Sequence, residues 1–289
     1  MENKLRLCAV CNTARCEYVK WITDPRMTVV GILLVFIRSF CIEPMQLHAE
    51  KFGVPLNAAE PFLAVCNSEM LALLMPAVYV LLICDFPVMG GSMMFFIHRT
   101  GKLNWFLGQL LFIAESIVTF LALILGGCML MSGGILSGNW SDTVTKYDAR
   151  FPEEAGGFVS RLLPPNLYNQ MSLPAALMQT LLLTALFLLA AALLMCCMKM
   201  LYLRTAGLFC TAAVIAAGAA LCTLRLRAMW LFPTANTMIW LHFHEILREP
   251  VTPVSRSYLY FGAVLALLLA ADLTVLRKLQ FINIGQEGS

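Results

Sequence analysis

The protein has 289 residues, of which 60% are hydrophobic and 13% are charged, and its formal net charge at pH 7 is +3. A soluble domain carries roughly 25% charged residues, so this composition excludes a globular protein that faces water on all sides. The small net charge, with no basic run longer than Arg277-Lys278, gives no sign of nucleic-acid binding.

Residues 1–26 predict an amphipathic helix on the inner membrane surface. Its apolar residues, Trp21 among them, would enter the interface, and its cations would face anionic headgroups. Cys8, Cys11 and Cys16 lie in the same segment, but a zinc site needs four ligands and no histidine is near. The three cysteines therefore predict no metal site, and the sequence leaves their role open.

Six segments are long and apolar enough to cross the hydrocarbon core, which takes about 20 residues. Because backbone groups in lipid must be satisfied within the segment, each is predicted to be a helix. The second is the least uniform, since Asn67, Ser68 and Glu69 lie in its first half. The predicted fold is all-α integral membrane, with 1–289 as a single transmembrane domain and spans at 27–45, 62–83, 105–131, 173–198, 205–224 and 257–276.

Two charged residues lie inside predicted spans. Arg38 is in the first span and Glu115 is in the third, each about ten residues from the inner end, so at about 1.5 Å per residue they reach a similar depth. Charges at such depth pair with each other or face a cavity. The sequence therefore predicts an ion pair between Arg38 and Glu115 that fixes helix packing, and lining of a substrate path is the alternative.

Residues 84–104 join the second and third predicted spans. Residues 93–98 are apolar and predict a short helix along the inner surface, followed by the basic turn Arg99-Thr100-Gly101-Lys102. An apolar face beside two cations is suited to docking of a soluble partner. An ordinary connection with an interfacial helix explains the same residues, so both interpretations stay open.

Two further segments are predicted to lie outside. Residues 132–172 form the longest loop, and residues 226–247 are too polar for a lipid-exposed helix. The second segment predicts an interfacial or re-entrant hairpin broken at Pro233, with Trp230 and Trp240 at the headgroup level. His242 and His244 within it are two residues apart and do not share a helix face, so they predict no metal site.

The distribution of Lys and Arg orients these spans. Segments 1–26, 84–104, 199–204 and 277–289 hold Lys and Arg at a higher density than the segments on the opposite side. Since cytoplasmic loops carry the excess of Lys and Arg, both termini are predicted to be cytoplasmic.

The chain lacks the common catalytic motifs. It has no G-x-x-x-x-G-K-[ST] phosphate loop, no G-x-S-x-G elbow and no H-E-x-x-H pair. We therefore expect no enzyme activity and no cofactor on this chain. If ATP drives the protein, another chain must bind it.

One local pattern adds a resemblance to the layout of spans. Asp85-x-Pro87 precedes Arg99-Thr100-Gly101-Lys102-x-x-Trp105-x-x-Gly108-Gln109 between spans two and three. This pattern, Glu60-Pro61 and the external Trp140 resemble the membrane subunit of bacterial ABC exporters of the type-2 permease fold, in particular the small permeases of Gram-positive bacteria.

The resemblance implies a permease with an N-terminal interfacial helix, six spans, and an external re-entrant hairpin before the last span. A coupling helix between spans two and three would seat in an ATP-binding cassette subunit, which holds ATP and Mg²⁺. A second permease chain, identical or similar, would complete the path for export across the bacterial plasma membrane. The implied coupling residues are Met93, Phe95, Phe96 and Arg99.

Other functions fit parts of the sequence. A secondary transporter accounts for the charges at Arg38 and Glu115, although no internal repeat is visible. A membrane protein that senses an external peptide, or confers immunity without transport, would use residues 132–172. A membrane-embedded enzyme would need clustered His, Asp or Glu, and the chain has only four histidines.

Overall fold

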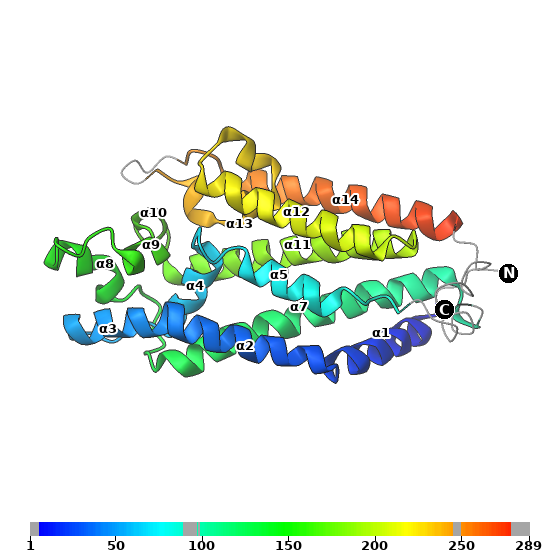
Figure 1. The fold of residues 1–289 in the computed structure, drawn as a ribbon, viewed down its shortest axis with the longest axis horizontal. Helices are drawn as coiled ribbons and strands as arrows, with labels where there is room; N and C mark the ends of the chain where they lie inside the picture. The colour runs from blue at the N-terminus through cyan, green and yellow to red at the C-terminus, as the bar shows by residue number, and fades with distance from the viewer. Residues whose placement is uncertain (1–5, 89–96, 98, 245–249, 279–289) are drawn as a thin grey trace.

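The computed structural model describes residues 6–88, 97, 99–244 and 250–278. These residues form an all-α bundle whose long helices run lengthwise (Figure 1). Helix α1 (Leu7–Ile22) begins, and helix α14 (Val254–Lys278) ends, at the same end of the bundle. We call this the α1 end, and the opposite end, which carries the short helix α8 (Asp142–Arg150), the α8 end.

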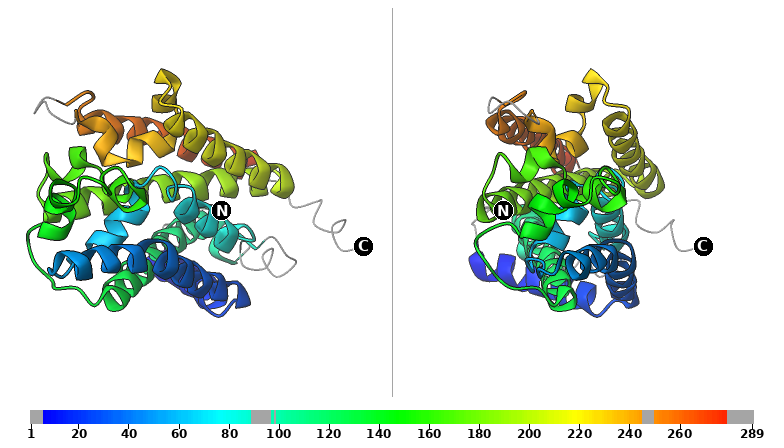
Figure 2. Two further views of the ribbon diagram at one scale, coloured as in Figure 1. Left: turned by 60° about the vertical axis from the view of Figure 1, so that its left-hand side comes forward. Right: turned by 90° about the vertical axis from the view of Figure 1, so that its left-hand side faces the viewer.

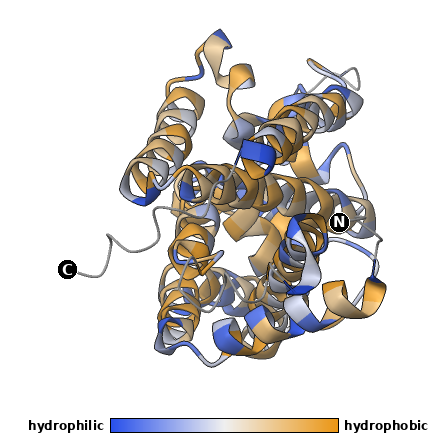
Figure 3. Ribbon diagram, turned by 90° about the vertical axis from the view of Figure 1, so that its right-hand side faces the viewer, coloured by the Kyte–Doolittle hydropathy of each residue, from blue (hydrophilic) through white to orange (hydrophobic). Residues whose placement is uncertain are grey.

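Within the described part of the chain, five helical stretches are long and apolar enough to cross a membrane, which makes this a multi-pass membrane protein. The hydrophobic colour dominates the long helices when the bundle is seen from the α1 end (Figure 3). These stretches correspond to five of the six predicted spans. They are Pro25–Phe52, α7 (Lys102–Ser132), α11 (Leu173–Met200), α12 (Arg204–Thr223) and α14.

The first stretch consists of four consecutive elements. They are η1 (Pro25–Met27), α2 (Thr28–Ile37), the π-helical turn η2 (Arg38–Ile42) and α3 (Glu43–Phe52). The Asp24 side chain starts it by accepting a hydrogen bond from the backbone N–H of Arg26 at 2.8 Å. Gly53 ends it in the left-handed region, with a φ of 81° that a side chain would disfavour.

The predicted second span, residues 62–83, is not one continuous helix. It is divided into α4 (Glu60–Asn67) and α5 (Leu74–Ile83), and neither part alone has the length of a span. Ser68 adopts an extended conformation with ψ of 132°, which ends α4. The polar residues that made this span the least uniform in the sequence lie at the break.

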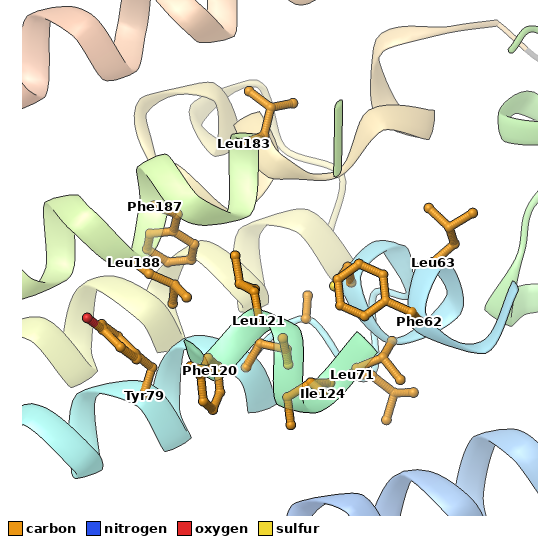
Figure 4. Close-up of a cluster of buried hydrophobic side chains, with 14 of the residues drawn as sticks. Phe62, Leu63, Leu71, Tyr79, Phe120, Leu121, Ile124, Leu183, Phe187 and Leu188 are labelled. Carbon is orange, nitrogen blue, oxygen red and sulfur yellow. The ribbon is translucent and has the colours of Figure 1, made fainter. Parts of the chain in front are cut away.

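The main hydrophobic core lies between α4, α5, α7 and α11 (Figure 4). Phe62 and Leu63 reach it from α4, and Tyr79 from α5. Side chains of α7 and α11 fill the rest: Phe120, Leu121, Ile124, Leu183, Phe187 and Leu188. Long-range packing of this kind holds the broken helix against two continuous ones.

Helix α1 is part of the bundle as well as a surface helix. A side chain added at Gly108 of α7 would place its Cβ 2.6 Å from Thr13 Cβ, so α1 and α7 approach closely. Trp21 is fully buried, and its ring centroid lies 6.3 Å from that of Phe112 in α7. The expectation that Trp21 enters the membrane interface is therefore wrong, because its indole is covered by protein.

Short helices cover the α8 end (Figure 2, right). Helices α8, α9 (Phe158–Leu162) and α10 (Pro165–Tyr168) belong to the long predicted loop. Residues 226–244 form η3 (Arg227–Leu231), α13 (Pro233–Thr237) and η4 (Ile239–His242), with an extended Phe232 just before Pro233. Trp240 is only 5% exposed, so its predicted place among lipid headgroups is wrong, since it packs inside the core.

Candidate functional site

Asp85 is the centre of an ion-pair cluster at the α1 end. It follows α5, in the segment Asp85-Phe86-Pro87, whose Phe86–Pro87 bond is cis. One carboxylate oxygen pairs with Arg26 Nη1 and the other with Arg204 Nη2. The Asp85 backbone carbonyl accepts a hydrogen bond from Lys199 Nζ. One short segment therefore contacts three cations from three different parts of the chain.

The positions of the three cations follow from local sequence. Arg26 lies in the turn that begins the first candidate span, Lys199 in the last turn of α11, and Arg204 is the first residue of α12. The dipole of a helix stabilises cations near its C-terminus. This favours Lys199 at the end of α11, and Arg26 and Arg204, which pair with Asp85 just after the end of α5. The cluster thus joins the ends of four helical elements.

Asp85, Lys199 and Arg204 line a pocket of about 1040 Å³. The side chain of Asp85 is 27% exposed, that of Arg26 is 37% exposed and that of Arg204 is 56% exposed. Pairs at such exposure contribute up to about 1 kcal/mol each. The cluster is therefore a modest electrostatic tie and not a deeply buried one.

The other end of the 84–104 segment is held by apolar contacts. Ile97 and Trp105 are buried together with residues of α11 and α14, forming a cluster with Phe106, Cys196, Met200 and Leu276. The backbone N–H of Gly101 donates to the Ile97 carbonyl at 2.8 Å. Asn104 accepts a hydrogen bond from the Arg6 backbone N–H at 3.1 Å, which ties the start of α1 to the same place.

The predicted coupling residues are only partly within the described residues. Met93, Phe95 and Phe96 lie outside them. Arg99 is in a helical conformation and exposed. What the structure adds is the anchoring of the segment at both ends, by ions at Asp85 and by apolar packing at Ile97 and Trp105. The sequence analysis placed Asp85 and Trp105 in a pattern but did not find their partners.

Arg38 has a different partner from the one expected. Its Nε lies 3.2 Å from Glu43 Oε1, whereas Glu115 is half-buried on α7 and its carbonyl accepts from Thr119 Oγ1 at 2.9 Å. The π-helical turn explains the choice, because hydrogen bonding from residue i to i+5 brings Arg38 and Glu43 onto one face. The pair is half-exposed, with 61% and 50% of the two side chains accessible.

Asn67 is a buried hub at the break between α4 and α5. Its Oδ1 accepts from the backbone N–H of Ile239 at 3.0 Å, and its Nδ2 donates to Thr180 Oγ1 at 3.1 Å. The Asn67 carbonyl accepts from Trp240 Nε1 at 2.7 Å. These hydrogen bonds hold the break against α11 and η4. In the sequence, Asn67 shows this role only as a polar residue within an apolar run.

His242 takes part in a second buried network. Its Nδ1 lies 2.9 Å from the Thr252 carbonyl, and its Nε2 lies 3.2 Å from Ser257 Oγ, which donates to Asn236 Oδ1. Burial lowers the pKa of His242 from its ordinary value of 6.5. Among the residues that the structure describes, no group of three or more His, Cys, Asp or Glu is arranged to hold a metal ion.

Glu60 is a buried carboxylate that organises the α8 end. It accepts hydrogen bonds from the Ser141 backbone N–H at 2.6 Å, the Ser141 hydroxyl at 2.9 Å and the Asn57 backbone N–H at 2.9 Å. Glu60 thus links the start of α4 to the start of α8.

No protein-family model, curated protein or solved structure matches this chain.

Proposed function

We propose that this chain is the permease subunit of an ABC exporter with the type-2 permease fold. It would lie in the bacterial plasma membrane with both termini cytoplasmic, and would work with a separate ATP-binding cassette subunit and a second permease chain. The α1 end would be the cytoplasmic end. Hydrolysis of ATP, with Mg²⁺, would occur on the partner and not on this chain.

The observation that carries the proposal is the anchoring of residues 84–104. A segment that receives force from a soluble subunit must be fixed to the helices that move, or the force is lost in loop motion. Here Asp85 joins the end of α5 to Arg26, before α2, and to Arg204, at the start of α12. In the proposed orientation these would be the inner ends of the three spans to which the coupling helix of the family transmits movement.

The course of the chain also supports a sixth crossing. The first candidate span ends at the α8 end and α7 begins at the α1 end, so α4 and α5 together carry the chain between the two ends (Figure 1). Counted as one broken crossing, they complete six spans. The short helices from Arg227 to His242 would be the external hairpin that precedes the last span.

The mechanism is a population shift between inward- and outward-facing permeases. Closure of the ATP-binding subunits would press on the segment that includes Met93, Phe95, Phe96 and Arg99. Because Asp85 is tied to two arginines, α5, α2 and α12 would tilt together. The close approach of α1 to α7 at Gly108 would make α1 follow α7.

The first test is affinity purification from native membranes in mild detergent, followed by mass spectrometry. We expect a soluble protein with a phosphate loop in near-stoichiometric amount. Arg99→Glu should remove that protein from the complex. The matched control is Lys146→Glu, another reversal of an exposed charge, which lies on α8 at the opposite end and should leave the complex intact. A stable chain that purifies without any ATPase would overturn the proposal.

The break between α4 and α5 favours one competing function. Secondary transporters place substrate sites at discontinuous helices, and Asn67 and Glu69 lie at such a break. The two functions differ in their energy source. Uptake or efflux in vesicles that contain only this chain, driven by an ion gradient without ATP, would favour the secondary transporter.

A further inference from the structure

A second pocket lies at the α8 end, beside the break between α4 and α5. Its volume is about 640 Å³, within the range of 300–1,000 Å³ that is usual for small-molecule sites. Residues 68–70 of the break form one wall, α9 and the start of α10 form another, and the end of α12 closes the third. The cluster around Asp85 is at the opposite end of the bundle.

The charged residues of this pocket balance one another. Glu69 and Asp148 supply two carboxylates, and Arg161 and Arg225 supply two guanidinium groups. The remaining wall is largely apolar and includes Met70, Phe158, Leu162, Pro164, Pro165 and Trp240. A ligand with a single charge would meet repulsion from one pair, whereas a ligand with both charges would be attracted by both.

Glu69 is incompletely satisfied by the protein. Its Oε1 is buried and accepts no hydrogen bond, although Arg225 Nη2 lies 3.6 Å away. That distance permits attraction but exceeds a normal hydrogen bond. Although Oε1 itself is covered, the Glu69 side chain is 27% exposed and lines the pocket. An ammonium group in the pocket would therefore meet the accessible part of a carboxylate that Arg225 does not fully neutralise.

Arg225 is placed at the pocket by the end of α12 and by contact with Trp240. It follows α12 with a φ of 50°, in the left-handed region that residues other than glycine rarely adopt. Its guanidinium carbon lies 5.5 Å from the ring centroid of Trp240, so the side chain rests over the indole. This conformation ends α12, because the backbone N–H of Leu226 donates to the Leu221 carbonyl at 3.2 Å across the left-handed residue.

We infer that this pocket binds a compact zwitterion that carries a primary ammonium, a carboxylate and an apolar side chain, as in an amino acid or an unblocked dipeptide. The ammonium lies against Glu69 and Asp148. The carboxylate lies between Arg161 and Arg225, where planar guanidinium groups offer paired donors. The apolar side chain packs against Phe158 and Trp240.

The inference does not depend on the proposed function, because the pocket can be tested on the isolated chain without ATP or a partner. The probe is the dipeptide Leu-Leu, titrated by calorimetry into the full chain in detergent. We expect saturable binding, weakened about tenfold or more by N-acetylation and, separately, by C-terminal amidation. A tenfold change corresponds to about 1.4 kcal/mol.

Two variants assign the ends of the ligand. Glu69→Gln should remove the difference between the dipeptide and its N-acetylated form, and Arg161→Gln should remove the difference between the dipeptide and its amide. If Glu69→Gln does not fold, Asp148→Asn tests the same end. The control is Asp142→Asn, an exposed carboxylate of α8 outside the pocket, which should bind Leu-Leu like the unmodified chain.

Three results would overturn the inference. The first is the absence of saturable binding up to about 10 mM dipeptide, and the second is equal affinity for blocked and unblocked dipeptides. The third concerns the source of the charges, because a phosphatidylethanolamine headgroup also combines an ammonium with an anion. If nanodiscs of phosphatidylethanolamine abolish dipeptide binding and nanodiscs of phosphatidylglycerol do not, the occupant is a lipid.

Discussion

The tie between Asp85 and its two arginines gives the most direct test of the structure. Asp85→Asn removes the negative charge but keeps the backbone carbonyl that accepts from Lys199. Two partly exposed ion pairs are lost, each contributing about 0.2–1 kcal/mol, and Arg26 and Arg204 remain without their carboxylate. We therefore expect the free energy of unfolding to fall by about 0.4–2 kcal/mol.

A double-mutant cycle separates the pairs from general effects of substitution. Asp85→Asn is combined with Arg26→Gln and, separately, with Arg204→Gln, and unfolding is followed in mixed micelles as denaturing detergent is added. We expect a coupling energy of about 0.5–1 kcal/mol for each pair. Because these side chains are 27–56% exposed, the coupling should shrink as salt rises from about 0.05 M to about 0.5 M.

The reasoning fails if both cycles are additive within about 0.3 kcal/mol, the usual scatter for independent sites. It also fails if the coupling persists unchanged in high salt, because a partly exposed pair is screened. Asp142→Asn on α8 serves as the control, since it breaks an exposed pair within one helix and should cost no more than about 0.5 kcal/mol.

Three further perturbations test other parts of the fold. Gly108→Val should lower the free energy of unfolding by about 1–3 kcal/mol, because the added side chain forces α1 away from α7. The control Gly126→Val, where nothing lies within 4 Å, should lower it far less. Equal decreases of the thermal unfolding midpoint would contradict the close packing of α1 and α7. Asn67→Ala leaves buried polar groups of α11 and η4 unpaired and should cost about 1–3 kcal/mol; an unchanged midpoint in denaturing detergent would refute its role as a hub. Burial lowers the pKa of His242, so the unfolded chain binds more protons there and the free energy of unfolding should decline as pH falls through 6.5. Unfolding midpoints measured between about pH 7.5 and 5.5 should decline less in His242→Gln than in the unmodified chain. An identical decline in both would exclude the contribution of His242.

The membrane class and most of the helix plan are encoded locally. Twenty or so consecutive apolar residues have one stable solution in lipid, so α7, α11, α12 and α14 could be predicted with ends close to those observed. The first span was predicted as well, but the structure extends it to Phe52, because Glu43-Pro44 continues the helix and Gly53 ends it. Local signals such as Asp24 and Gly53 mark helix ends without reference to the rest of the chain.

Partners across long distances in sequence were decided only by tertiary structure. Asp85 meets Arg26 and Arg204, and Asn67 meets Thr180 and Trp240, because separate helices bring them together. The amino-acid composition does not specify these contacts, since any Lys or Arg of the chain could pair with a given carboxylate.

The same limit explains the predictions that were wrong. Trp21 and Trp240 carry the amphipathic character typical of the interface, yet both are buried because α1 and η4 pack into the bundle. The pairing of Arg38 with Glu43 depends on a π-helical turn, which shifts the register of side chains by one residue. Sequence by itself determined that this is a helical membrane protein, whereas the break in the second span, the cluster at Asp85 and the pocket at Glu69 depend on which helix faces pack together.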